Sequence, residues 1–387
     1  MKMKRLEAHK QALYELRFSP MCKPATEVAN LTHLESHTTR ARTMMMWRIA
    51  EGIIDWGPRE VELLYESTLD SISEAFDVFH YPISTYMLDA RADVWEADLA
   101  PACVRQVVEA SAAQTPDRPP TVPGGGALLL AGEIAQLGDD VLLAPTSAAL
   151  QAAGVGAAAW VAPTGALAYA LGARDVARAQ AARVVERVQA SGAQTIVADG
   201  PETAWALTRV YPALGVDLPD GVAVRLLSEV LDGSLTSSFV SVPPSLSGRG
   251  RGRVDLGKVF VHDSRPAYLI ADEAPSYTVI LPGYTEDEST FGGGVVYKAP
   301  RHLLDCLGAQ RVHGAWTRAL ARTSGADDGL WLTHPDLAAG LAAQRLDHAE
   351  RLGATTVVAD SPLAAAYLAK HAQGREIEVR LLAELFS

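Results

Sequence analysis

The sequence predicts an α/β fold in which two related α/β modules, arranged about a pseudo-twofold axis, follow a helical amino-terminal region. Three observations carry this prediction: a segment that returns 161 residues later, short apolar runs that alternate with amphipathic stretches, and a first quarter with helical composition and no strand pattern. Short apolar strands that alternate with helices are typical of a parallel sheet covered on both faces.

The repeat defines the two modules. Residues 192–203 (GAQTIVADGPET) and 353–364 (GATTVVADSPLA) are identical at seven of twelve positions, and VRLLSE at 224–229 matches VRLLAE at 379–384. Each copy runs from an apolar stretch through an Asp and a Pro into an Ala-rich stretch. Pro is well tolerated in a first helical turn, because its missing N–H has no partner there. We therefore expect the Asp of each copy at the carboxyl edge of a sheet, where open α/β sheets usually bind ligands.

Composition divides the chain into five segments. Residues 1–110 are rich in helix formers, Met and aromatic side chains, and they predict a helical domain. Pro and Gly concentrate in residues 111–126, which we interpret as a first linker, and residues 233–257 as a second linker. Two Rossmann-like modules then occupy residues 127–232 and 258–387.

Local patterns place elements inside these modules. The short apolar runs predict strands at 127–131, 141–144, 195–198, 258–262 and 277–281. The amphipathic stretch 173–190 predicts a helix, and helices are expected at 202–210 and 363–371.

Bulk composition narrows the class of protein. The 387 residues are 48% hydrophobic and 21% charged, with no apolar stretch long enough to span a bilayer. The amino terminus lacks the apolar core of a secretory signal, so we expect a cytoplasmic protein. A net charge of −12 argues against nucleic acid as a partner. The three cysteines, Cys22, Cys103 and Cys306, are too few and too scattered for a disulfide framework or an all-cysteine metal site.

Motifs in both modules follow one order. The second module contains VFVHDSR at 259–265, VYKAPRHLL at 296–304, TSG at 323–325 and SPLA at 361–364. The first contains GE at 132–133, PTG at 163–165 and GPET at 200–203. These motifs resemble the paired cysteine-rich modules, called CCG domains, of heterodisulfide reductases, the glycolate oxidase iron-sulfur subunit and the lactate-utilisation iron-sulfur proteins. There the same places carry His-Asp-Pro-Cys, Cys-Cys-Gly and Cys-Pro-x-Cys.

In this resemblance the turn-forming glycines and prolines remain, whereas every cluster-binding cysteine of the modules is absent. The resemblance and the strand ends together nominate a set of polar candidates for the cleft between the modules: Glu133, Thr164, Asp199, Thr203, His262, Asp263, Arg265, Ser324, Asp360 and Ser361.

The amino-terminal region resembles the two-cluster ferredoxin domain of the same families, in a degenerate form. The Cys-x2-Cys-x2-Cys-x3-Cys spacing that binds a 4Fe-4S cluster falls on Ser19, Cys22, Ala25, Ala29 and on Ser67, Asp70, Ser73, Asp77. ESHTTRAR at 35–42 resembles the segment that follows the first cluster in those proteins. One thiol cannot hold a cluster, so we expect no 4Fe-4S cluster and no other cofactor. The second set suits a hard cation such as Mg²⁺ or Ca²⁺ only weakly.

Other polar pairs have two interpretations. His262 beside Asp263 could act as a base or ligand, or could shape the turn. Glu133 and Arg265 replace cysteines in opposite modules, and they are candidates for an ion pair across the cleft. Asp327 and Asp328 lie on a Gly-rich turn and are expected to be solvated.

The sequence favours a cluster-free scaffold or regulatory subunit of an iron-sulfur and flavin oxidoreductase complex. Expected partners are a flavin-linked dehydrogenase subunit or a cysteine-bearing paralogue. Any association with a membrane is expected to be peripheral and to occur through such a partner. One alternative is a small-molecule enzyme or sensor that uses the cleft between the modules, where a carboxylate ligand would pair with Arg265. A second is an electron-transfer iron-sulfur subunit with non-standard ligands, including ligands shared between subunits.

Overall fold

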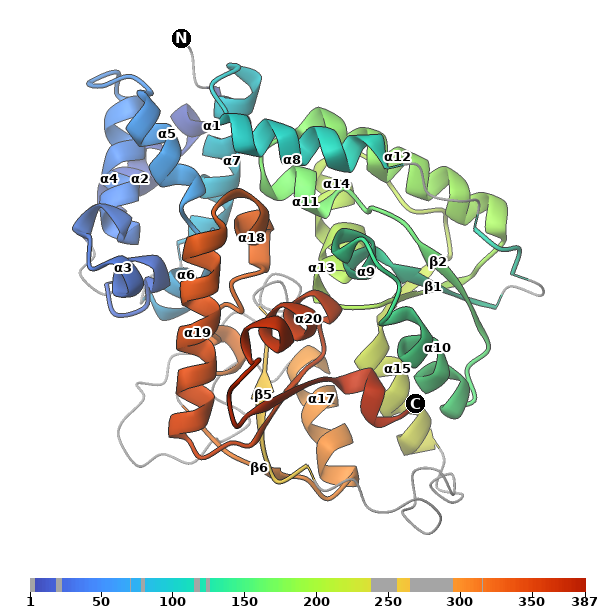
Figure 1. Ribbon diagram of the computed structural model, residues 1–387. Helices are drawn as coiled ribbons and strands as arrows, with labels where there is room; N and C mark the ends of the chain where they lie inside the picture. Colours follow the sequence, from blue (N-terminus) through green and yellow to red (C-terminus); the bar gives the residue numbers. More distant parts are fainter. Residues whose placement is uncertain are drawn as a thin grey trace.

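The computed structural model describes residues 4–18, 23–69, 71–77, 81–114, 119–122, 126–237, 256–264, 295–314 and 316–387 (Figure 1). The protein is a mixed α/β structure with two four-stranded parallel sheets. The amino-terminal helices pack beside one sheet, and the carboxyl-terminal half lies below them in Figure 1.

Helices make up the regular structure of the amino-terminal region. They are α1 (Lys4–Ala8), α2 (Lys10–Leu16), α3 (Glu27–Thr32), α4 (Thr39–Ala50), α5 (Pro58–Tyr65), α6 (Ser71–Phe76), α7 (Ile83–Glu96) and α8 (Ala102–Ala113), with a 3-10 turn η1 (Glu35–His37). The last helix therefore extends into the segment expected as the first linker.

A fully buried arginine ties this helical region to the first sheet. The guanidinium of Arg91, on α7, donates hydrogen bonds to the carbonyls of Leu64 and Ser67, and to that of Ala170 at 2.8 Å. Because backbone carbonyls satisfy the guanidinium, the charge is tolerated inside the core.

The first sheet has the strand order β2-β1-β3-β4, with β1 (Ala127–Ala131), β2 (Ala157–Val161), β3 (Thr195–Ala198) and β4 (Ala223–Leu226) all parallel. Its helical elements are α9 (Gly132–Leu137), α10 (Leu143–Ala152), α11 (Ala166–Ala170), α12 (Arg174–Ser191), α13 (Pro201–Trp205), the π-helical turn η3 (Ala206–Val210), α14 (Tyr211–Ala213) and α15 (Leu227–Ser237). Parallel strands need such crossover helices.

The second sheet has the corresponding order, β6-β5-β7-β8, and is also parallel. Its strands are β5 (Lys258–His262), β6 (Gln310–Arg311), β7 (Thr356–Ala359) and β8 (Glu378–Leu381). The helical elements are α17 (Val295–Cys306), η4 (Arg318–Leu320), η5 (Asp327–Gly329), α18 (Leu330–Thr333), α19 (Pro335–Arg351), α20 (Pro362–His371) and η6 (Leu382–Leu385). In the repeated segments β3 leads into α13 and β7 into α20, as the sequence predicts.

One strand prediction is wrong, and one strand of the first sheet was not predicted. The apolar run 141–144 is no strand: α10 begins at Leu143, and Pro145 lies in its first turn, where a missing N–H costs little. The strand is instead β2, whose Ala-rich sequence AAAWV contains one β-branched residue, Val161, and therefore gives only a weak strand pattern. The strand expected at 277–281 lies outside the described residues.

The two sheets share a hydrophobic core. Leu129 and Val197 of the first sheet belong to the same buried cluster as Val261 and Val358 of the second. Helix α15 at the end of the first half packs against α17 of the second. Burial of this shared apolar surface holds the halves together. In the part of the chain that the structure describes, no helix has the length and apolar character needed to cross a membrane.

Candidate functional site

Asp199 follows β3 and lies at the carboxyl edge of the first sheet, as predicted. Its carboxylate is fully buried and accepts hydrogen bonds from the backbone N–H groups of Gly132, Glu133 and Ile134, at 3.2, 3.4 and 3.0 Å. The Thr203 hydroxyl donates to the same carboxylate at 2.6 Å. Asp199 therefore caps the start of α9, where a helix leaves N–H groups without intrahelical partners.

Glu133, on α9, joins the two halves of the protein. One of its carboxyl oxygens accepts the N–H of Glu202, at the start of α13, at 2.8 Å. The other accepts the N–H of Leu363 at 3.3 Å and is hydrogen-bonded to the Ser361 hydroxyl at the start of α20. Glu133 is only 1% exposed. One buried carboxyl group thus binds the amino ends of the corresponding helices of both repeats.

Acidic side chains crowd this edge. Burial, then the charges of Asp199 and Glu202, raise the pKa of Glu133 well above its usual range. Burial also raises the pKa of Asp199 to about 6, although its Thr203 and backbone hydrogen bonds oppose the shift. Like charges in a buried site disfavour ionisation of both groups. The edge is therefore able to hold protons on carboxyl groups near neutral pH.

The second sheet presents Asp263 and His262 at its own edge. Asp263 forms a buried bidentate ion pair with Arg301, with both N–O distances at 2.7 Å, and accepts the N–H of Arg318 at 2.7 Å. Burial alone would raise the pKa of Asp263, but the Arg301 charge outweighs it and the pKa is lowered. Asp263 therefore stays charged and anchors α17 and η4, which fits a structural role.

His262 has a different environment. Its Nδ1 accepts a hydrogen bond from the Nε of Arg345 at 2.9 Å, whereas its buried Nε2 has no hydrogen-bond partner among the described residues. Burial, with the nearby Arg345 charge, lowers the pKa of His262 well below its usual value. The imidazole is therefore neutral, and it is held by an arginine rather than by Asp263.

Asp360 and Ser361 end β7 as Asp199 and Gly200 end β3. Within the described part of the chain, one carboxylate oxygen of Asp360 is buried without a hydrogen-bond partner. Burial, with the charge of Asp263, raises the pKa of Asp360 to about 7. The Ser361 hydroxyl caps α20 by accepting the N–H of Ala364 at 3.1 Å. Asp199 and Asp360 thus occupy equivalent positions in the two repeats but have different surroundings.

Thr164 and Ser324 occupy matching turns. Both side chains are buried, and each hydroxyl accepts a backbone N–H two residues on, from Ala166 at 3.4 Å and Ala326 at 3.1 Å. These threonine and serine hydroxyls thus stabilise their own turns.

In the helical region, the described positions that match the cluster-binding cysteines pack against other residues of the same chain. The Ser73 hydroxyl is buried and hydrogen-bonds with Thr39 at 2.8 Å, and Thr39 bonds with Thr26 at 3.0 Å. The remaining described positions, Ala25, Ala29, Ser67 and Asp77, are also buried. Ser19, Cys22 and Asp70 lie outside the described residues. So does Arg265, and with it the expected pair with Glu133.

Sequence reasoning missed two residues and misjudged one pair. Glu27 of α3 accepts the N–H of Thr323, at the start of the predicted turn, at 2.6 Å, and burial raises its pKa to about 8. Nothing near Glu27 in the sequence signals this contact across 296 residues. Arg345 was missed as well, because its place within α19 gives no signal of its hydrogen bond to His262. Asp327 and Asp328 are buried, contrary to the expectation that they are solvated.

Comparisons with known proteins bear on the fold. No family model matches the chain. No curated protein matches it. A solved structure, described as the crystal structure of a hypothetical protein from Helicobacter pylori, matches with a TM-score of 0.57 and 11% sequence identity, over 99% of this chain and 72% of the other. Similarity at this identity extends to the fold alone.

The donor atoms at these edges do not fit an iron-sulfur cluster. Clusters need soft thiolates, whereas the described candidates offer carboxyl, hydroxyl and imidazole groups. Among the residues with described positions, no group of three or more His, Cys, Asp or Glu side chains could hold a metal ion. The chemistry that this arrangement supports is hydrogen bonding and proton retention within the protein.

Proposed function

We propose that the protein is a cluster-free scaffold or regulatory subunit of an iron-sulfur and flavin oxidoreductase complex, of the heterodisulfide reductase or glycolate/lactate oxidase type. The observation that carries the proposal is the bond of Glu133 to both halves. This side chain lies where the resemblance expects a cluster ligand, and it binds backbone N–H groups and a hydroxyl instead. Such a contact fixes the arrangement of the halves without redox chemistry.

The proposal includes the architecture that the resemblance implies: two Rossmann-like modules about a pseudo-twofold axis behind a degenerate ferredoxin-like domain. It is supported by the common strand order of the two sheets. The turn glycines Gly165 and Gly325 support it too, because each has a positive φ and lies against a backbone carbonyl of the following long helix. The hydroxyl cluster around Ser73 supports a helical domain that is packed without thiolate ligands.

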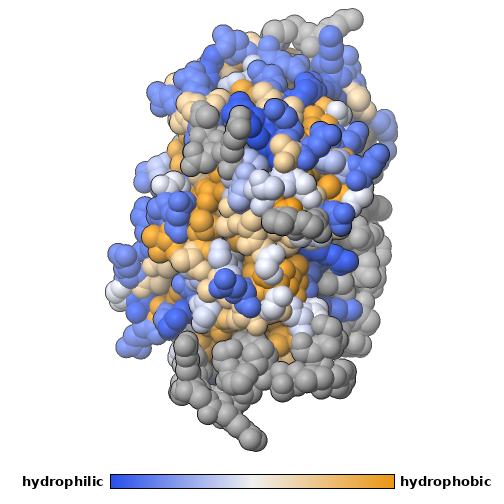
Figure 2. All heavy atoms as spheres, turned by 90° about the vertical axis from the view of Figure 1, so that its right-hand side faces the viewer, coloured by the Kyte–Doolittle hydropathy of each residue, from blue (hydrophilic) through white to orange (hydrophobic). Residues whose placement is uncertain are grey.

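The surface offers a place for a protein partner. Figure 2 shows apolar side chains gathered across the middle of the face on the right of Figure 1, where β2 and α10 run. Val141, two residues before α10 begins, is 74% exposed, and the edge strand β2 is only partly buried. Exposed apolar patches often mark protein interfaces. We propose that a flavin-linked dehydrogenase subunit or a cysteine-bearing paralogue in the cytoplasm binds here, and that any membrane association is peripheral and through this partner.

The test is isolation of the tagged chain at native level, followed by size-exclusion chromatography and by iron and flavin analysis of the isolated complex. We expect a fixed stoichiometry with a flavin- or cluster-bearing subunit, and no iron in the chain after separation. Val141→Asp should abolish the complex. Ile53→Asp, which changes a 56% exposed side chain of the helical region, is the matched control and should leave it intact.

Two results would contradict the proposal. One is a separated chain that carries about four irons and a broad visible absorbance, which would identify an electron-transfer subunit. The other is a chain that stays free of any flavin- or cluster-bearing subunit at native concentration.

A further inference from the structure

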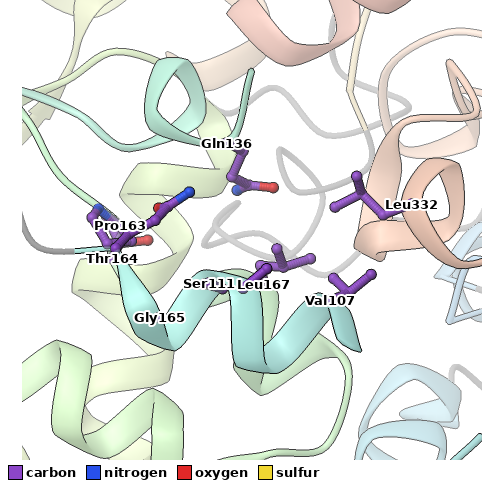
Figure 3. A pocket seen from close by; sticks show the side chains of 10 residues that line it. Val107, Ser111, Gln136, Pro163, Thr164, Gly165, Leu167 and Leu332 are labelled. Atoms are coloured by element: carbon purple, nitrogen blue, oxygen red, sulfur yellow. The ribbon is translucent and has the colours of Figure 1, made fainter. Parts of the chain in front are cut away.

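A pocket lies where three regions of the chain meet. It has a volume of about 160 Å³ and lies between α8, α9, the turn before α11, and α18 (Figure 3). Ten residues line it: Val107, Ala110, Ser111, Gln114, Gln136, Pro163, Thr164, Gly165, Leu167 and Leu332. Among the predicted cleft residues, Thr164 lines this pocket.

The walls are apolar with a few neutral polar groups. Val107, Leu167 and Leu332 supply aliphatic surface, and none of the described residues that line the pocket carries a charge. A charged ligand would lose its hydration here without gaining an opposite charge. The pocket therefore favours an uncharged molecule.

The amide of Gln136 points into this space (Figure 3). Its nitrogen donates to a carboxylate oxygen of Glu202. Because a carboxylate oxygen accepts that N–H, the contact fixes the amide orientation and turns the carbonyl oxygen away from Glu202. That oxygen, Oε1, is buried and has no hydrogen-bond partner among the residues that the structure describes. A buried acceptor without a donor costs free energy, so a ligand N–H would be stabilising here.

Two hydroxyl groups complement this acceptor. Ser111 Oγ accepts a hydrogen bond from Gln180 at 3.1 Å, and Thr164 Oγ1 accepts one from Ala166 at 3.4 Å. Among the described residues neither hydroxyl donates a hydrogen bond, so both protons are available. The pocket thus combines one free acceptor with two free donors.

We propose that this pocket is a binding site for a small, uncharged ring compound with an amide or lactam group. The N–H of the ligand would bind Gln136 Oε1, its carbonyl would accept from Ser111 or Thr164, and its ring would pack on Leu167 and Leu332. The volume suits one ring, since an apolar cavity of about 150 Å³ holds benzene. This inference does not depend on the proposed oxidoreductase complex.

The probe for the test is benzamide, which has the ring and the amide. Acetophenone keeps the shape and the carbonyl but lacks the N–H, and benzoate adds a charge. Titrations of the full chain, followed by ligand-observed NMR and by thermal unfolding, should show that benzamide binds and raises the unfolding temperature. Acetophenone should bind about tenfold more weakly, because one hydrogen bond is lost. Benzoate should bind more weakly still.

Variants locate the binding. Gln136→Met removes the acceptor at similar volume and should reduce benzamide affinity about tenfold while leaving acetophenone unchanged. Leu332→Trp fills the pocket from the opposite wall, does not touch Glu202, and should abolish binding of both. Gln151→Met, in a separate pocket beside β2, is the matched control and should bind benzamide as the unchanged protein does.

The proposal would be overturned by equal binding of benzamide and acetophenone, which indicates an apolar hollow without recognition. It would also be overturned if benzamide failed to bind the unchanged protein, or if Leu332→Trp left binding intact.

Discussion

At the level of single residues, the candidate site is held together by carboxyl side chains that bind the amino ends of helices. The sequence predicts that Glu133, Asp199 and Ser361 lie together in the cleft between the halves, and it offers Arg265 as a partner for Glu133. It does not predict that the carboxylates bind helix amino ends. Asp199 accepts three backbone N–H groups and Glu133 accepts two from different halves. Such contacts depend on where helices start in space, which neighbouring residues in the sequence do not determine.

The raised pKa of Glu133 has a consequence for folding. A carboxyl group whose pKa is higher in the folded than in the unfolded chain favours folding at low pH, and this contribution is lost as the pH rises from the unfolded value toward the folded one. Glu133→Gln removes the titration and retains an acceptor for the Glu202 N–H. On raising the pH from about 5 to 8, the unfolding free energy of the variant should therefore rise relative to that of the unchanged protein.

Urea denaturation at several pH values measures this difference. Glu186→Gln, on the exposed side of α12, is the control and should follow the unchanged protein at every pH. A parallel pH dependence for Glu133→Gln and the unchanged protein would show that Glu133 ionises normally.

Elements were predictable where the repeat and the local chemistry agreed. The strands at 195–198 and 258–262 were predicted from apolar runs. The helices predicted at 173–190 and 363–371, from amphipathic or Pro-initiated patterns, are found at 174–191 and 362–371. Periodicity failed for 141–144 and for β2, because short Ala- and Leu-rich runs fit both a helix and a buried strand. Sheet order, with β1 and β5 between neighbours from later in the chain, was settled only by tertiary packing.

The matching turns before the long helices give a prediction at the scale of elements. Gly165 has a φ of +91° and Gly325 a φ of +89°, and an added Cβ would lie 2.8 Å from the Ala177 carbonyl oxygen and 2.2 Å from that of Ala338. Alanine at either position combines an unfavourable conformation with a backbone clash. Gly165→Ala and Gly325→Ala should each destabilise the protein by about 2–4 kcal/mol, measured by chemical denaturation.

Gly374 separates the two causes. It has a φ of +83° but nothing within 4 Å of an added Cβ, so Gly374→Ala should cost only about 1 kcal/mol. Equal losses at all three positions would mean that the close helix approach at Gly165 and Gly325 contributes nothing.

In the molecule as a whole, hydrogen bonds join segments that are far apart in the chain. Glu27 binds the N–H of Thr323, Arg91 binds the carbonyl of Ala170, and Glu133 reaches Leu363. Sequence periodicity reports the face that an element buries, not the element that covers it. The internal repeat therefore predicted two α/β halves, while the hydrogen bonds and core that unite them came only from the structure.

The hydrophobic core that the two halves share predicts that they unfold cooperatively. Val197 in the first sheet and Val358 in the second belong to one buried cluster, so loss of either half exposes apolar surface of the other. Differential scanning calorimetry should show one transition, which Val197→Ala and Val358→Ala each move to lower temperature as a whole, because each leaves a small cavity in the shared core. Two transitions, with each variant shifting only its own, would instead establish that the halves unfold independently and that the Glu133 contact adds little to their association.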